Sequence, residues 1–220
     1  MPAATRPTLL LTRPQADSVR LAAMLPEWPA VISPILRIVP VAHDAARLRA
    51  ANALVFTSAH AVPSAGPGAG RRALCVGGRT ANAARAAGFS VTEGPGDAEG
   101  LLPLIAAWEG PLLHPHGQHV ARVLPVPGIV VYDQTPQDLS NEAQDLLGQG
   151  GDVILPLFSA RSAQLVAEAV RGTVSRLWPV AISAAVMQAW NAPFAGQAMA
   201  DAPTQDAVAR AIRGLGRAEP

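Results

Sequence analysis

The chain has 220 residues, half of them hydrophobic and 15% charged, so it can form one large domain or two small ones and is not of the disordered class. Every one of its 17 cationic side chains is an arginine, which excludes a Schiff-base lysine and the lysine of a Walker-type phosphate loop. A formal net charge of +1 does not require nucleic acid or a membrane surface as a partner.

Apolar runs and helical periodicities alternate along the whole chain. Strands are predicted over 9–11, 30–32, 34–40, 54–57, 73–76, 89–91, 128–132, 153–157 and 179–182. Helices are predicted over 16–25, 44–51, 80–87, 98–108, 141–147, 162–170, 184–190 and 204–213, with Gly88 as a C-terminal cap. This alternation favours parallel sheets with right-handed crossovers.

The sequence has one cysteine and shows no pattern of a secretory signal or a membrane span. Cys75 is the only cysteine, so an intramolecular disulfide and a cysteine-type zinc site are excluded, and its apolar run 73–76 predicts a buried, unreactive thiol. The first eight residues lack the apolar stretch of a secretory signal, and no apolar run reaches the length of a membrane span. We therefore expect a soluble, cytoplasmic protein.

Two segments about a hundred residues apart, 53–62 and 152–163, look like copies of one another. Each is a short apolar run that ends in Phe and a small hydroxyl residue before a predicted helix start. A buried parallel strand that leads into a helix has this pattern. The repetition predicts two similar α/β lobes with a cleft between them, which suits a large ligand.

Hydroxyl residues stand at the matching strand ends. Thr57, Ser58 and Ser159 could offer hydroxyl and amide donors to a ligand, or they could simply cap the helices that follow. Neither serine lies in G-x-S-x-G, so a hydrolase nucleophile is not expected.

The turn Gly77-Gly78-Arg79-Thr80 joins a predicted strand to a predicted helix. Amides at a helix start favour an anion, although the turn could equally be a plain cap. Its spacing is not G-x-G-x-x-G, so the dinucleotide fingerprint is absent.

Three histidines and a single tyrosine complete the candidates. His114, His116 and His119 have no carboxylate nearby and stand among Pro and Gly, which predicts a solvated turn rather than a metal site. Tyr132 ends an apolar strand close to a predicted crossing between lobes; the alternative is a strand-end aromatic residue with a hydrated hydroxyl.

The order and spacing of these motifs over nearly the full length resemble the uroporphyrinogen-III synthase family. The features that carry the resemblance are 11–14, 56–62, 76–81 with Gly88, 131–132, 158–159 and 202–204. The family implies two flavodoxin-like α/β parallel-sheet lobes joined by a two-stranded linker. Residues 1–34 plus 136–220 would form one lobe and 38–130 the other, with linker strands near 35–40 and 131–135. The sequence alone would have suggested tandem halves.

The resemblance also implies an activity and a set of site residues. The reaction is the cyclisation of hydroxymethylbilane, with inversion of ring D and loss of water, to uroporphyrinogen III, without a metal or organic cofactor. Tyr132 is implied as the residue that hydrogen-bonds or protonates the departing hydroxyl. The implied substrate-binding residues are Arg13, Thr57, Ser58, His60, Gly77, Arg79, Thr80, Ser159, Arg161 and Ser183.

Departures from the family pattern keep other functions open. His60 stands where the family often has Arg, and Val186 replaces a threonine of the second strand-to-helix turn. A non-catalytic tetrapyrrole-binding or regulatory protein on the same fold is the first alternative. An unrelated two-lobed small-molecule binder or nucleotide-sugar transferase is the second. For the synthase we expect a monomer, with a transient contact to hydroxymethylbilane synthase.

Overall fold

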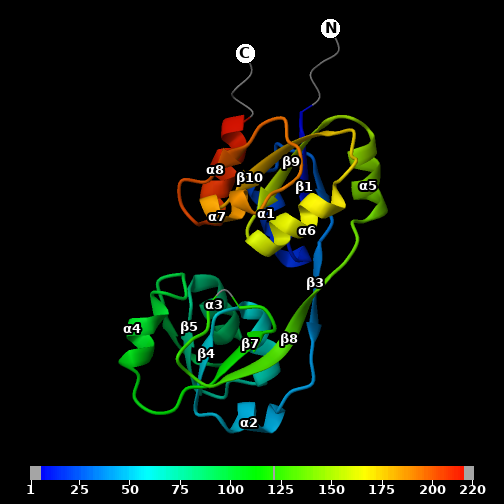
Figure 1. The fold of residues 1–220 in the computed structure, drawn as a ribbon. Helices are drawn as coiled ribbons and strands as arrows, with labels where there is room; N and C mark the ends of the chain where they lie inside the picture. Colours follow the sequence, from blue (N-terminus) through cyan, green and yellow to red (C-terminus); the bar gives the residue numbers. More distant parts are fainter. Residues whose placement is uncertain (1–5, 121, 216–220) are drawn as a thin grey trace. The chain divides into compact units, whose positions relative to one another are not determined.

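The computed structural model describes residues 6–120 and 122–215 (Figure 1). The chain divides into two compact units. The first unit combines the N-terminal segment up to Arg37 with the segment from Pro136 onward, and the second unit is Ile38–Thr135. The chain passes from one unit to the other within two strands, β3 (Leu36–Pro40) and β8 (Gly128–Pro136).

The first unit is a five-stranded parallel sheet with helices on both faces. Its strand order is β11-β10-β9-β1-β2. The strands are β1 (Thr8–Leu11), β2 (Ala30–Ile32), β9 (Asp152–Leu157), β10 (Arg176–Ala181) and β11 (Ala198–Met199). The helices are α1 (Gln15–Met24), α5 (Asn141–Gly148), α6 (Ala160–Ala169), α7 (Ala184–Gln188) and α8 (Gln205–Leu215).

Numbered within the unit, these strands run 2-1-3-4-5, the flavodoxin order. Strand β2 pairs with one edge of β1, and β9, which follows much later in the chain, pairs with the other edge. Ligands of such sheets bind where this reversal opens a crevice, at the carboxyl ends of the two central strands. In this unit that position lies beyond Leu11 and Leu157.

Both faces of this sheet are buried, which explains the continuous apolar runs of its strands. Leu9 and Leu11 pack with Leu21 of α1 and Val208 of α8. Leu10 points the other way and packs with residues of α5 and α6, among them Ala143, Val166 and Ala167. The alternation follows from the two-residue period of a strand.

The second unit holds two three-stranded sheets, β3-β8-β7 and β4-β5-β6. Its remaining strands are β4 (Ala53–Phe56), β5 (Arg72–Cys75), β6 (Ser90–Glu93) and β7 (His114–Gly117), and its helices are α2 (Ala45–Ala50), the 3-10 helix η1 (Ala59–Ala65), α3 (Gly78–Ala86) and α4 (Leu101–Ala106). A parallel bridge between Leu54 and Leu113 joins β4 to β7. From β4 the strand order runs to β5 and β6 on one side, and it resumes with β7 and β8 on the other side, which places a second crevice at the carboxyl ends of β4 and β7.

The strands that carry the chain between the units run antiparallel. Gln137 N–H donates to Ile35 O over 3.0 Å, and Val41 N–H donates to Val131 O over 3.2 Å. The residue numbers rise on one strand as they fall on the other. β8 runs nine residues, so the strand predicted to end at Tyr132 continues past it to Pro136.

One local prediction was wrong, and one strand was missed. The helix start predicted after the first Phe-hydroxyl pair opens a 3-10 helix, in which Pro63 lacks an N–H donor and which Gly66, at φ 67°, ends. The helix predicted from residue 98 begins only at Leu101, after Asp97 accepts a hydrogen bond from Gly100 N–H. Strand β11 is too short to leave a signal in the sequence.

The predicted solvated turn at the histidines is also wrong, because residues His114–Gly117 form strand β7. Neighbouring main chain supplies its pairing: His114 N–H donates to Pro127 O, and Gln118 N–H donates to Tyr132 O, each over 2.9 Å. Two predictions are confirmed here. Gly88 follows α3 at φ 86°, and the Cys75 thiol is buried, which raises its pKa to about 11.

Candidate active site

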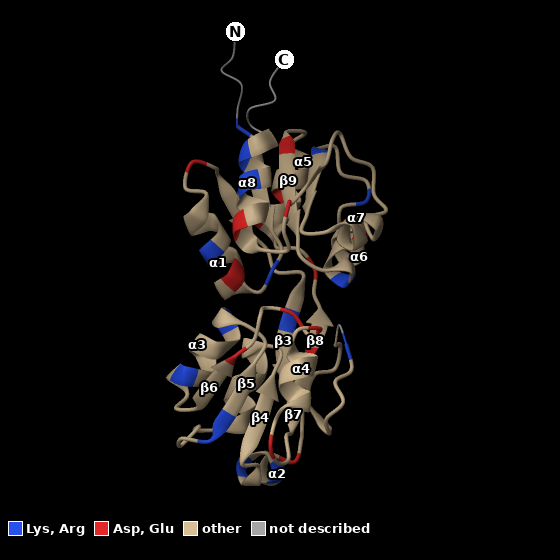
Figure 2. Ribbon diagram, turned by 90° about the vertical axis from the view of Figure 1, so that its left-hand side faces the viewer, with Lys and Arg blue, Asp and Glu red and all other residues tan. Residues whose placement is uncertain are grey.

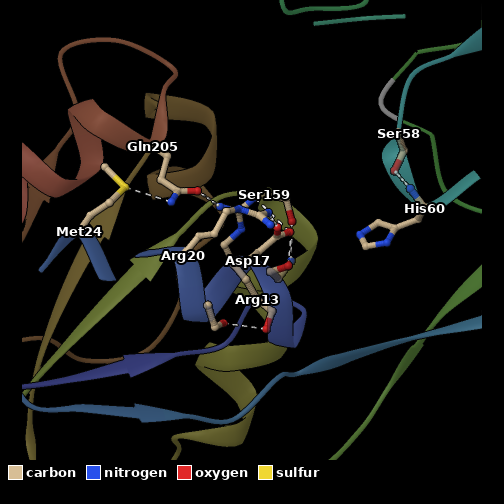
Figure 3. A network of polar contacts seen from close by, with 10 residues as sticks. Arg13, Asp17, Arg20, Met24, Ser58, His60, Ser159 and Gln205 are labelled. Carbon is tan, nitrogen blue, oxygen red and sulfur yellow. Dashed lines mark hydrogen bonds and ion pairs between the residues drawn. The ribbon is translucent and has the colours of Figure 1, made fainter. Parts of the chain in front are cut away.

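In the second unit, the carboxyl end of β4 carries two of the candidate hydroxyl groups. Thr57 Oγ1 lies 2.9 Å from Nε2 of His114 on the neighbouring strand β7. Ser58 caps η1: its Oγ accepts a hydrogen bond from His60 N–H over 3.2 Å (Figure 3). An accepting hydroxyl still has its own proton to donate, so the capping role and a binding role of Ser58 are compatible.

The turn between β5 and α3 brings backbone amides to the same edge. Gly77 is the residue before α3, and a Cβ on it would lie 2.9 Å from Cα of Gly96, so a side chain there would force the backbone apart. Within the first turn of α3, Arg79 is exposed and Thr80 is buried. The dipole of a nine-residue helix that begins at such a turn favours an anion at this end.

Tyr132 lies in the core of this unit and is only 4% exposed. Its ring rests on the backbone of Gly117, where a Cβ would lie 2.6 Å from ring carbons and 2.9 Å from the hydroxyl oxygen. The His60 ring meets it edge to face, with 6.0 Å between ring centroids. The phenol is thus held in one orientation by packing on two sides.

His114 is a functional candidate that sequence reasoning missed. Its side chain is 3% exposed, and burial, with a smaller contribution from His116, lowers its pKa to about 4. The two imidazole centroids are 4.8 Å apart. His114 is therefore neutral near pH 7, and its hydrogen bond to Thr57 joins two uncharged groups. The prolines and the glycine around His114 are typical of a turn, so the sequence did not predict that this histidine lies buried in a strand.

In the first unit, Arg13 follows β1 and is held from three directions (Figure 3). Its Nη1 donates to Gln205 Oε1 over 2.9 Å, and its Nη2 lies 3.4 Å from Oδ2 of Asp17. Its guanidinium carbon lies 4.1 Å from the centroid of the Phe158 ring, at the carboxyl end of β9. Such stacking favours the planar guanidinium over an ammonium.

Asp17 was also missed. Its side chain is 3% exposed, and it pairs with both Arg13 and Arg20 (Figure 3). The spacing of three residues between Asp17 and Arg20 was a usable signal, because residues so spaced meet on a helix surface, whereas Arg13 precedes α1. Burial of the carboxylate between two arginines could not be read from the sequence.

The remaining candidates of the first unit stand at the starts of two helices. Ser159 caps α6: it accepts from Ser162 N–H over 3.1 Å and donates to Ser162 Oγ over 2.9 Å. Arg161 is half-buried in the first turn of α6. Ser183 precedes α7 and makes no side-chain cap hydrogen bond.

The structure thus gathers the predicted binding residues into two sets, one in each unit. The first set lies at the carboxyl ends of β1, β9 and β10 and comprises Arg13, Ser159, Arg161 and Ser183. The second set lies at the ends of β4 and β5 and comprises Thr57, Ser58, His60, Gly77, Arg79 and Thr80.

In the view of Figure 2, positively and negatively charged residues are scattered over the elements and do not form one large patch of a single charge. No cluster of three or more His, Cys, Asp or Glu able to hold a metal ion occurs among residues 6–120 and 122–215. Within the same ranges, no helix has the length and apolar character needed to cross a membrane.

These features define a class: an α/β protein of two parallel-sheet units, each with helix starts, hydroxyl groups and arginine suited to anions at the carboxyl edge of its sheet. The family model described as uroporphyrinogen-III synthase HemD matches residues 27–210. The chain belongs to this family, whose members are cyclising lyases of tetrapyrrole biosynthesis.

Solved structures show the same fold. The chain is similar to the uroporphyrinogen-III synthetase of Helicobacter pylori, at 15% identity and a TM-score of 0.65, over 96% of this chain and 100% of that one. It is also similar to a mutant uroporphyrinogen III synthase of the extremely thermophilic bacterium Thermus thermophilus, at 15% identity and a TM-score of 0.51, over 96% and 98% of the two chains. No curated protein matches the chain by sequence.

Proposed function

We propose that this protein converts hydroxymethylbilane to uroporphyrinogen III. The observation that carries the proposal is the family match over residues 27–210, which spans residues of both units. The reaction begins with loss of the ring A hydroxyl as water, which leaves an azafulvene cation. Ring D then attacks through its substituted carbon to give a spiro intermediate, which fragments and recloses with ring D inverted.

The two sets of candidate residues suit a substrate with eight carboxylates. Helix starts at Gly77 and Ser159 offer backbone amides, and anions bind there without an excess of positive charge. Arg13 adds a guanidinium fixed by three contacts, and charge-assisted bonds of this kind are stronger than neutral ones. A protein of net charge +1 can therefore bind this polyanion through a few placed donors.

Tyr132 is the proposed proton donor to the departing hydroxyl. A phenol O–H donates a hydrogen bond, and the packing against Gly117 and His60 fixes the direction in which it does so. The rest of the catalysis is positional: ring D must be held over ring A while the spontaneous closure without inversion is prevented.

The direct test mixes the purified protein with freshly generated hydroxymethylbilane, oxidises the products and separates the uroporphyrin isomers. Isomer III above the no-enzyme control is the expected result. Isomer I alone, formed at the spontaneous rate, would refute the activity.

One observation supports a second candidate function. Val186, which stands where the family has a threonine, is buried in the core of the first unit, so position 186 offers no hydroxyl donor. A non-catalytic tetrapyrrole-binding protein would tolerate that loss. It would bind uroporphyrinogen III and leave the isomer ratio at its spontaneous value.

We also propose that the enzyme acts as a monomer in the cytoplasm and receives its substrate through a transient contact with hydroxymethylbilane synthase. The instability of the open-chain substrate supports such a transfer. Sedimentation of the purified protein tests whether it is a monomer. Dependence of the isomer ratio on the concentration of hydroxymethylbilane synthase tests the transient contact.

A further inference from the structure

His114 and Thr57 form a polar contact between the two strands whose carboxyl ends make the crevice of the second unit. The atoms Nε2 and Oγ1 are 2.9 Å apart, although the residues are 57 positions apart in the chain. Val55 N–H donates to Leu113 O over 2.9 Å, so the main chains of β4 and β7 are fixed immediately before both side chains.

The two partners differ in exposure. The His114 side chain is 3% exposed, whereas Thr57 is half-buried at the strand end. Thr57 is the more exposed partner and thus the one that a ligand reaches more readily, so the imidazole can act on a ligand through the threonine. The threonine hydroxyl has one donor and two acceptor functions. The bond to His114 uses one of them and restricts the rotation of the hydroxyl, which leaves the others available to a ligand.

The charge state of the imidazole suits this role. Burial and the neighbouring His116 ring lower the pKa of this imidazole to about 4, so it is neutral near pH 7. A neutral hydrogen bond of this kind can order the hydroxyl without adding a charge to the strand end.

We propose that His114 is a positioning residue that acts through Thr57, holding its hydroxyl in the orientation that binds a polar group of the tetrapyrrole. The proposal rests on the binding role of Thr57 in the proposed function. His114 itself does not contact the ligand.

A double-mutant cycle on the full chain tests the coupling. The probe is the dissociation constant of uroporphyrinogen III under anaerobic conditions, which requires no turnover. Thr57→Val removes the hydroxyl at nearly constant volume, and it is expected to weaken binding about tenfold, the effect of one lost hydrogen bond. His114→Phe is expected to weaken binding by a similar factor. The double variant is expected to bind no more weakly than either single variant, because both changes remove the same interaction.

Multiplied effects in the double variant would overturn the proposal, as would unchanged binding in His114→Phe or no binding by the unaltered protein. His114→Gln, whose amide can reach Oγ1, is expected to restore most of the affinity and keeps the test decisive if the Phe variant does not fold. His43→Phe is the matched control, because the His43 ring bonds to the carbonyl oxygen of Val41 in the same unit. Failure of the proposed function is seen separately, as an unchanged isomer ratio with the unaltered protein.

Discussion

The guanidinium carbon of Arg13 lies 4.1 Å from the ring centroid of Phe158, and this stack joins the carboxyl ends of β1 and β9 in the first unit. The two residues are far apart in the chain and meet because β1 and β9 are adjacent strands. Asp17 and Gln205 hold the same guanidinium from α1 and α8 (Figure 3). Residues of α1, α8 and β9 therefore hold the cation that follows β1, at the point where the strand order of the sheet reverses.

Asp17→Asn is expected to destabilise the protein. The carboxylate is buried, but Arg13 and Arg20 are 22% and 48% exposed, so water can solvate the arginines left behind and the loss is expected to be about 2 kcal/mol in the free energy of unfolding. Urea denaturation measures this. Asp201→Asn is the control, because Asp201 is 71% exposed in its pair with Arg210 and should contribute less than about 1 kcal/mol. Equal losses in both variants would contradict the interpretation.

Tyr132→Phe is expected to lower kcat about a hundredfold, the usual effect of removing a general acid, while KM changes little. The fold should survive, because the ring that contacts Gly117 and His60 is retained. Circular dichroism and the rate of isomer III formation are the measurements. Full activity would remove Tyr132 from the mechanism.

Gly117→Ala is expected to displace the Tyr132 ring, which packs on the backbone of Gly117. The new Cβ would lie 2.6 Å from two ring carbons, so the ring must move, at a cost of about 1–3 kcal/mol in stability and with a fall in turnover. Gly148→Ala is the control, since a Cβ at that position meets no atom within 4 Å. A Gly117→Ala protein with ordinary turnover would show that the ring position does not matter.

Stability is expected to fall on acidification because of His114. The folded pKa of about 4 lies below the ordinary value of 6.5, so the unfolded chain takes up a proton that the folded chain refuses. The contribution is complete above pH 6.5 and is lost as the pH falls from 6.5 to about 4, up to about 3 kcal/mol. The His116 ring, 4.8 Å away, adds to the shift.

The measurement is the free energy of unfolding in urea across this pH range for the unaltered protein and for His114→Gln. The carboxylates contribute alike to both proteins, so the difference isolates the histidine. A His114→Gln protein with an unchanged pH dependence would contradict the buried, neutral imidazole.

Local signals in the sequence were sufficient for most strands and helices. The run Leu9-Leu10-Leu11 is a strand because both faces of its sheet are buried, and Gly88 ends α3 because only glycine adopts its φ of 86° at no cost. The order of such motifs also gave the family, which the match over residues 27–210 confirms.

Long-range contacts decided what the sequence could not. Pro115 and Gly117 are typical of a turn, yet hydrogen bonds from His114 N–H and Gln118 N–H to the adjacent chain make this segment a strand. The contact of His114 with Thr57, and the burial of Asp17 beside Arg13, join elements whose proximity depends on strand order. Local propensity acts over a few residues, whereas strand pairing is fixed by the burial of whole faces, so the partners of the site residues exist only in the folded sheets.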